Sequence, residues 1–247
     1  MLTLDNIHVS FGQRAILAGI TADIAPGGIT AVMGPNGCGK TTLLRCIGGL
    51  LQPNSGRVLI DHKPVGDYTA RQLAQRLAFV RQHAQTDFEF SAFETVLMGR
   101  NPYQHHLQNE SQADWDIVER CMRQTGTWHL RLATPAQMSG GELQRVMIAR
   151  ALAQETPVLL LDEPVSSLDI AHQLEIMRLL RQASEKTILI VIHDLNLALQ
   201  FCDRLMLLHE GRMLFHGPVA EGLTPNNTRL VYGVDTHMAD GHIIFEY

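Results

Sequence analysis

The sequence GPNGCGKT, residues 34–41, decides the fold of this chain. It follows the apolar stretch ITAVM (29–33) and leads into a helical pattern at 42–47. Its spacing matches GxxxxGK[ST], in which glycines let backbone N–H groups face phosphates and a helix N-terminus adds partial positive charge. A plain glycine-rich turn is the alternative, but strand, spacing, Lys and Thr all agree with a phosphate site. The predicted contacts are Gly34, Pro35, Asn36, Gly37, Cys38, Gly39, Lys40, Thr41 and Thr42, with Lys40 on the terminal phosphates and Thr41 on Mg²⁺.

Two adjacent carboxylates follow a second apolar stretch, residues 158–161. The carboxyl ends of parallel strands form the ligand-binding edge of an α/β sheet, so Asp162 and Glu163 are expected there. Asp162 would hold Mg²⁺, and Glu163 would polarise the attacking water for phosphoryl transfer. His193, which follows the apolar stretch 187–192, would contact the γ-phosphate. The alternatives are an acidic pair that caps the next helix and a purely structural histidine.

Short strands separated by turn residues alternate with helical patterns along the chain. From 109 to 153 the periodicity is helical, with Trp115, Val118, Cys121 and Met122 expected on one face. Strands flank a helix at 170–183, the βαβ pattern of a parallel sheet. Further strands are expected at 2–9, 16–24, 29–33, 57–60, 77–80, 158–161, 187–192, 205–208, 213–215 and 242–245, with a last helix beginning near Pro225. The sequence therefore predicts an α/β protein with a nucleotide-binding core and an inserted helical lobe.

Composition excludes several classes of protein. The 247 residues are 45% hydrophobic, and the formal net charge of −5 with mixed signs makes nucleic acid a poor partner. The four cysteines form no CxxC pair, so neither a zinc cage nor a disulfide framework is indicated. The longest apolar runs fall far short of the roughly 20 residues that span a bilayer. We therefore expect a chain with reduced thiols that does not itself cross a membrane.

The segment MSGGELQR (138–145) closely resembles the LSGGQ signature of ABC-type ATPases. Ser139, Gly140 and Gly141 lead into a helix expected over 142–153, a second anion-binding helix N-terminus in one chain. A simple serine-capped helix is the alternative. In the family, two copies associate head to tail, and the signature of one copy closes on the ATP held by the other. The resemblance therefore implies a homodimer in which Ser139, Gly140, Gly141 and Glu142 contact nucleotide.

Other positions match the same family in order. Gln82 resembles the glutamine that senses Mg²⁺ and the γ-phosphate, so the resemblance implies a metal set of Thr41, Gln82 and Asp162. Residues 166–169 resemble the loop that meets the partner copy. Phe11 stands where relatives stack a tyrosine on adenine, although it could instead be a core residue. Met138 and Val165 depart from the family pattern without threatening catalysis.

The resemblance implies one ABC ATPase domain over residues 1–247. Its fold class is a P-loop NTPase core with an antiparallel β subdomain and an inserted α-helical signature subdomain. The expected divisions are a nucleotide-binding core with β subdomain at 1–82 and 155–217, a helical lobe at 83–154 and a C-terminal extension at 218–247. The implied cofactors are ATP and Mg²⁺.

Residues 82–109, with Phe88, Phe90 and Phe93, correspond to the family segment that receives a helix of the membrane subunit. The same aromatic residues could instead fill the interface of the lobe. The runs VLMGRNPY and LTPNNTRLVYGV are similar to importer ATPases for iron-siderophore complexes, cobalamin and haem. As candidate cargoes of such an importer, we rank cobalamin and ferric siderophore equally, haem next, and molybdate or tungstate last.

The resemblance implies a chain at the cytoplasmic face of the membrane, bound to polytopic permease subunits and linked indirectly to a substrate-binding protein. A soluble ABC ATPase without a transport role is the rival. This sequence has one cassette and no long coiled-coil heptads, unlike the family's translation factors and repair ATPases. A small-molecule kinase with the same phosphate loop would leave the signature without a purpose.

Overall fold

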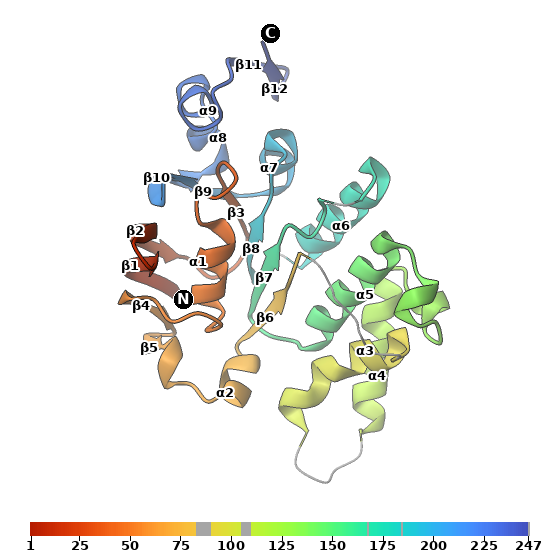
Figure 1. Cartoon of the computed structure of the whole chain (residues 1–247). Helices are drawn as coiled ribbons and strands as arrows, with labels where there is room; N and C mark the ends of the chain where they lie inside the picture. Colours follow the sequence, from red (N-terminus) through yellow and green to blue (C-terminus); the bar gives the residue numbers. More distant parts are fainter. Residues whose placement is uncertain (83–89, 105–109, 167, 184, 247) are drawn as a thin grey trace.

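A six-stranded sheet forms the centre of the molecule (Figure 1). The computed structural model describes residues 1–82, 90–104, 110–166, 168–183 and 185–246. In spatial order the strands of this sheet are β10 (Arg212–Pro218), β9 (Arg204–His209), β3 (Ile29–Met33), β8 (Thr187–Val191), β7 (Val158–Asp162) and β6 (Leu77–Val80). All but β10 run parallel, so their carboxyl ends meet at one edge.

The parallel strands are buried on both faces. Val32 of β3 joins one apolar cluster, while its neighbours Ala31 and Met33 join the other. All five residues of β3, of β7 and of β8 are buried, which explains why these strands are apolar except at Thr30, Asp162 and Thr187.

An antiparallel sheet covers one face together with α1 (Lys40–Ile47). Its order is β2 (Arg14–Ile24), β1 (Leu2–Phe11), β4 (Ser55–Ile60) and β5 (Lys63–Pro64). Leu2, Leu4, Ile7 and Val9 of β1 point into the core with α1, as the alternation of the sequence predicts.

Helices cover the opposite face and form the lobe at the right of Figure 1. The lobe contains α3 (Ala92–Leu97), η2 (Met98–Tyr103), α4 (Gln112–Gln124), η3 (Trp128–Leu130), η4 (Pro135–Gln137) and α5 (Gly140–Ala153). The remaining helical elements are η1 (Val65–Asp67), α2 (Ala70–Ala74), α6 (Ile170–Gln182), α7 (Leu195–Phe201), α8 (Val219–Gly222) and α9 (Pro225–Tyr232), and a hairpin of β11 (Thr236–Ala239) and β12 (His242–Phe245) ends the described chain. Within the described residues, no helix is both long and apolar enough to cross a membrane.

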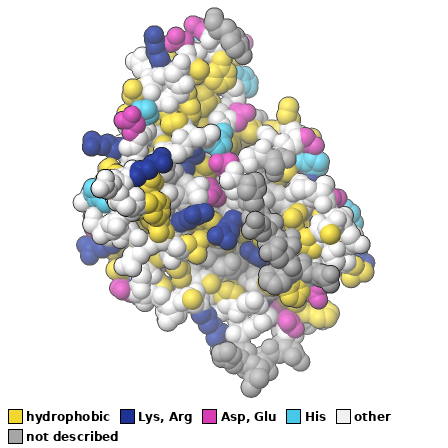
Figure 2. Space-filling model, in the orientation of Figure 1, with side chains coloured by type: hydrophobic (Ala, Val, Ile, Leu, Met, Phe, Trp, Pro, Cys, Tyr) yellow, Lys and Arg dark blue, Asp and Glu magenta, His cyan; other side chains and the backbone are white. Residues whose placement is uncertain are grey.

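The predicted strands at 29–33, 77–80 and 242–245 and the start of α9 at Pro225 are confirmed to the residue. The shared face expected for α4 is only partly right. Val118, Cys121 and Met122 are buried, but Trp115 is 49% exposed; its ring packs edge-on against Phe93, with 5.7 Å between ring centroids. Several further elements, among them α2, β5, α7, α8 and β11, were not predicted, since each is too short to show a clear periodicity. Figure 2 shows basic side chains scattered among apolar and acidic ones over the face in view.

Candidate functional site

The phosphate loop, residues 34–41, connects β3 to α1 as predicted. Gly34 has φ 145° and Gly39 has φ 106°, backbone conformations that side-chain-bearing residues rarely adopt. A Cβ on Gly34 would collide with the Leu208 carbonyl oxygen, and one on Gly39 would lie 2.5 Å from Leu17 Cδ2. Both glycines are therefore favoured by close packing as well as by φ.

Lys40 and Thr41 begin α1 and face the loop and the sheet edge. Lys40 Nζ donates to the carbonyl oxygens of Gly34 and Pro35, at 2.9 Å each, and the residue is only 6% exposed. Its ammonium is thus folded against the loop that would hold the phosphates. The backbone amides of the loop and this buried cation form an anion-binding cradle.

A buried carboxylate lies next to this cradle. Thr41 Oγ1 donates to Asp162 Oδ1 over 3.1 Å, and Asp162, the last residue of β7, is 4% exposed. Burial raises the pKa of the Asp162 carboxyl, and the Thr41 hydrogen bond opposes that rise without cancelling it. A divalent cation would stabilise the charged carboxylate, and oxygen donors suit Mg²⁺. The residues present therefore fit the predicted metal, although Gln82 does not contact Thr41 or Asp162 among the hydrogen bonds that the structure describes.

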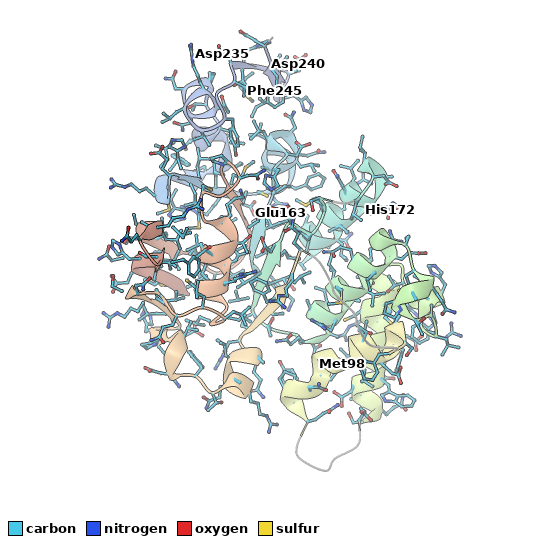
Figure 3. All side chains as sticks on the ribbon, in the orientation of Figure 1. Met98, Glu163, His172, Asp235, Asp240 and Phe245 are labelled. Atoms are coloured by element: carbon cyan, nitrogen blue, oxygen red, sulfur yellow. The ribbon has the colours of Figure 1, made fainter. Side chains whose placement is uncertain are left out.

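Glu163, labelled near the centre of Figure 3, contacts residues from two other chain segments. Its Oε2 accepts from Gln82 Nε2 at 2.6 Å, and its Oε1 lies 2.8 Å from His193 Nε2. Gln82 comes shortly after β6, Glu163 directly after β7 and His193 shortly after β8. The predicted glutamine, glutamate and histidine are thus brought together at the carboxyl edge of the sheet.

Local backbone geometry orients this cluster. Glu163 has φ 50°, a turn conformation that is uncommon outside glycine, and Ser166 Oγ donates to the Glu163 carbonyl oxygen at 3.1 Å. Because Asp169 is the N-cap of α6, the alternative in which the acidic pair caps the next helix is wrong. The stretch 166–169 includes residue 167, which lies outside the described residues.

Sequence reasoning missed the helix cap that directly follows His193. Asp194 is the N-cap of α7, and its carboxylate accepts from the backbone N–H groups of Asn196 at 2.8 Å and Leu197 at 2.9 Å. This cap sets the chain direction directly after His193. An aspartate before the apolar-periodic run LNLAL was the available signal.

The signature, residues 138–145, begins α5 in the lobe. Ser139 is the N-cap, and its Oγ accepts from Glu142 N at 3.3 Å while the Glu142 carboxylate accepts from Ser139 N at 2.8 Å. These bonds to Ser139 lower the pKa of Glu142. The observed helix begins at Gly140, two residues earlier than expected, because the capping box closes on Ser139.

The signature and the phosphate loop do not form one site within the chain. In Figure 1, α5 lies with α3 and α4, and the strands β6 and β7 separate it from α1. In the described parts of the chain, no hydrogen bond or ion pair joins Ser139 or Glu142 to the cradle. Ser139 and Gly140 are exposed, so this second helix N-terminus is open to another molecule.

Phe11 ends β1 and is 57% exposed, so its alternative assignment to the core is wrong. Cys38, within the loop, is buried, and all four cysteines are free and buried. Phe93 packs against Trp115 and Trp128, which supports the alternative that it fills the interface of the lobe. Phe88 lies outside the described residues.

Comparisons with known proteins agree with this geometry. Residues 17–166 match the family model described as ABC transporter. The chain is 39% identical to the cobalamin import ATP-binding protein BtuD of Halobacterium salinarum, over 97% of this chain but only 61% of that protein's length. It is 37% identical to the hemin import ATP-binding protein HmuV of Pseudomonas putida over 98% of both chains. It is 34% identical to the ferric enterobactin transport ATP-binding protein FepC of Escherichia coli, over 96% of this chain and 88% of the relative.

Solved structures show the same fold. An inward-facing structure of a putative metal-chelate type ABC transporter superposes with a TM-score of 0.85 at 26% identity, covering 100% of this chain and 97% of that one. The dimeric structure of a bacterial ABC transporter cassette gives a TM-score of 0.79 at 30% identity, covering 89% and 99%.

The fold and the cradle define a nucleotide-binding ATPase core of the phosphate-loop class. The chain belongs to the ABC transporter family. The predicted family and fold class are thereby confirmed.

Proposed function

We propose that this chain is the ATP-hydrolysing subunit of an importer for a metal chelate, either cobalamin or a ferric siderophore. The observation that carries the proposal is the placement of Glu163 between Gln82 and His193, beside the buried pair of Thr41 and Asp162. A carboxylate held by two side chains next to a phosphate cradle is the arrangement that water activation at a γ-phosphate needs.

In the proposed reaction, the loop amides and Lys40 hold the phosphates, and Phe11 stacks on the adenine. Thr41 and Asp162 would hold Mg²⁺, which neutralises charge on the phosphates when bound. Glu163 accepts a proton from the attacking water, while His193 and Gln82 fix the orientation of its two oxygens. Whether Gln82 also joins the metal shell stays a prediction.

A second copy of the chain would complete each site. The exposed N-terminus of α5 offers backbone N–H groups and the Ser139 hydroxyl to an anion, whereas the chain's own cradle already has a helix N-terminus in α1. A head-to-tail homodimer pairs each signature with the partner's ATP. We expect Ser139→Arg to block this closure, and hydrolysis at the wild-type rate in the assembled transporter would contradict the composite site.

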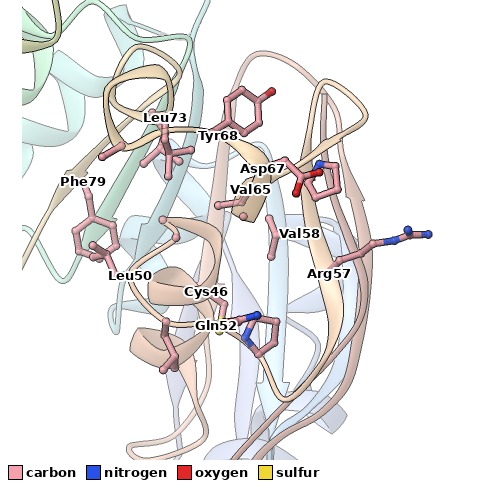
Figure 4. Close-up of a pocket in the computed structure, with 18 of the residues that line it drawn as sticks. Cys46, Leu50, Gln52, Arg57, Val58, Val65, Asp67, Tyr68, Leu73 and Phe79 are labelled. Carbon is pink, nitrogen blue, oxygen red and sulfur yellow. The ribbon is translucent and has the colours of Figure 1, made fainter.

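The permease subunits would bind beside η2 at the cytoplasmic face of the membrane. A cavity of about 820 Å³ lies between the end of α1, α2 and β6 (Figure 4), and its wall includes Leu50, Leu73 and Phe79. Leu50 is 58% exposed. The cavity adjoins the predicted docking segment 82–109. Arg71 of α2 and Gln75, the C-cap of α2, both donate to the Pro102 carbonyl oxygen in that segment. An apolar groove next to that segment suits a short helix of a membrane subunit. Residues 83–89 and 105–109 of the segment lie outside the described residues.

Cargo is proposed from the relatives alone, because the substrate of an importer need not touch this subunit. Haem is the second candidate, supported by the hemin relative that matches nearly the full length of both chains. The test is uptake of labelled cobalamin by cells that carry either the wild-type chain or Lys40→Ala in place of the native copy. Loss of uptake only in the mutant supports a cobalamin importer. Equal uptake rules out cobalamin and moves the assignment to ferric siderophores and then haem.

A further inference from the structure

Arg100 of η2 is a buried cation that the nucleotide site does not use. It is 7% exposed, and a buried charge is costly unless it is fully paired. Its Nε donates to Asp114 Oδ1 at 2.9 Å, and its Nη1 donates both to the Ala153 carbonyl oxygen at 2.7 Å and to Glu155 Oε2 at 3.0 Å. The guanidinium also lies 4.4 Å from the centre of the Tyr103 ring. One side chain therefore connects η2 to α4 and to the end of α5.

The charge of Arg100 is compensated by negatively charged partners. Burial raises the pKa of the Asp114 carboxyl, but the hydrogen bonds from Ser111 and Arg100 outweigh it and leave the pKa below its usual value. Ala153 is the last residue of α5, where unpaired carbonyl groups give the helix a partial negative charge. A guanidinium fork can satisfy a carbonyl and two carboxylates together, which an ammonium cannot do with the same geometry.

Backbone packing independently ties η2 to the end of α5. A Cβ on Gly99 would collide with the Arg150 carbonyl oxygen in the last turn of α5, so the two backbones are in close contact. Tyr103 OH donates to the Gln154 carbonyl oxygen at 2.8 Å. Gln154 in turn donates from Nε2 to Leu77 O at 2.9 Å, where β6 of the core begins. The end of α5 is thus held from one side by η2 and from the other by the core.

The other end of α5 is the signature. The helix has 14 residues and therefore spans about 21 Å at 1.5 Å per residue. A helix of this length transmits a shift of its C-terminal end to Ser139, because its internal hydrogen bonds keep it rigid. The segment with Met98 and Arg100 is also the part of the lobe proposed to meet the permease; Figure 3 shows Met98 in the lobe, away from Glu163 at the centre.

We propose that Arg100 is a positioning residue that couples the permease-facing segment η2 to the signature at the opposite end of α5. Movement at η2 would reach Ser139 through the bonds from Arg100 to Ala153 and Glu155. The inference rests on the proposed function, since it requires a permease that contacts this segment.

The test compares Arg100→Gln and Arg100→Lys with the matched control Arg123→Gln. Arg123 is also a lobe arginine with a carboxylate partner, but its side chain is 59% exposed; it pairs with Glu119 within α4 and lies 5.1 Å from the centre of the Trp128 ring. Each chain is purified alone and as the complex with the membrane subunits that co-purify with it, reconstituted in liposomes. Three quantities are measured: the melting temperature, the affinity of the chain alone for ATP, and the ATPase rate per chain in the complex divided by that of the chain alone.

We expect Arg100→Gln to keep the ATP affinity and to lower the ratio of rates by about three- to thirty-fold, the range for residues that carry coupling between sites. Arg100→Lys keeps the charge but not the fork, so its ratio should lie between the wild type and Arg100→Gln. Arg123→Gln should keep the wild-type ratio. A merely structural arginine would lower the melting temperature without changing the ratio of rates, and that result would overturn the proposal.

Glu155→Gln keeps the test decisive if Arg100→Gln does not fold. The Glu155 side chain is 41% exposed, so its neutralisation should be tolerated while one anchor of Arg100 is weakened. We expect a smaller drop in the ratio of rates, and an unchanged ratio here would also overturn the proposal. If the wild-type chain neither co-purifies with a polytopic membrane protein nor gains ATPase activity from it, the proposed function itself fails, and this inference fails with it.

Discussion

Replacement of Glu163 by glutamine tests the assignment of the hydrolytic base most directly. Glutamine has nearly the same shape, so the turn after β7 and the contact with Ser166 at the Glu163 carbonyl oxygen remain. The new side chain still accepts a hydrogen bond from Gln82 through its amide oxygen. Its amide nitrogen faces His193, which can accept if its Nε2 is unprotonated. The change in unfolding free energy should therefore stay near that of one charge-assisted hydrogen bond, about 1.5 kcal/mol, which corresponds to about 3–6 °C in melting temperature.

The catalytic effect should be much larger than the effect on stability. A glutamine cannot take the proton of the attacking water, and loss of a positioned general base lowers rates about 10²- to 10⁴-fold. This corresponds to about 3–5 kcal/mol in the activation barrier. ATP binding should persist, because Lys40 and the loop glycines are untouched, and ATP should accumulate in a closed dimer.

The assay measures phosphate release at saturating Mg-ATP, ATP affinity by calorimetry, and dimerisation by size exclusion with and without ATP. The control is Glu221→Gln, an equal loss of charge at an exposed position in α8. The reasoning is refuted if Glu163→Gln retains a rate within about threefold of the wild type, since general-base removal should cost at least 10²-fold.

Three further outcomes are expected. Lys40→Ala should weaken ATP binding by at least about tenfold, because it removes a charged phosphate donor, each such bond being worth about 1.5–3 kcal/mol; calorimetry showing wild-type affinity would contradict this. Asp162→Asn should raise the melting temperature of the ligand-free chain, because burial penalises the charged carboxylate, and should abolish the extra stabilisation by Mg²⁺ with ATP; thermal scans in which Mg²⁺ still adds its full shift would exclude Asp162 as a metal ligand. Burial lowers the pKa of His216 from 6.5, so the unfolded chain binds a proton at this histidine more readily than the folded chain does. The neutral His216 therefore contributes fully to stability above about pH 6.5, and this contribution is lost as pH falls through the lower pKa of the folded state. Melting temperatures between pH 7.5 and 5.5 should fall less steeply in His216→Gln, and parallel curves would argue against a role for this histidine.

Much of the catalytic machinery could be predicted because its residues are fixed by local sequence. The phosphate loop needs glycines at particular φ values, and the carboxylates must follow an apolar strand. Short elements were less accessible: β11 shows no periodicity, and it pairs with β12 only through contacts made after folding. The exposure of Trp115 could not be read from its spacing, because periodicity assigns a residue to a helix face but does not show how far neighbouring elements cover that face.

The sequence by itself determined the class of protein, since the order of phosphate loop, signature, acidic strand and histidine is a property of the chain. Only the tertiary structure decided which partner each side chain has. Gln82 contacts Glu163 rather than Thr41 or Asp162, Phe11 is exposed, and Arg100 connects η2 with α4 and α5. The physical reason is that hydrogen bonds and burial depend on distances between segments far apart in the chain. Those distances are set by the packing of the helices on the sheet, and periodicity reports only which face of an element is apolar.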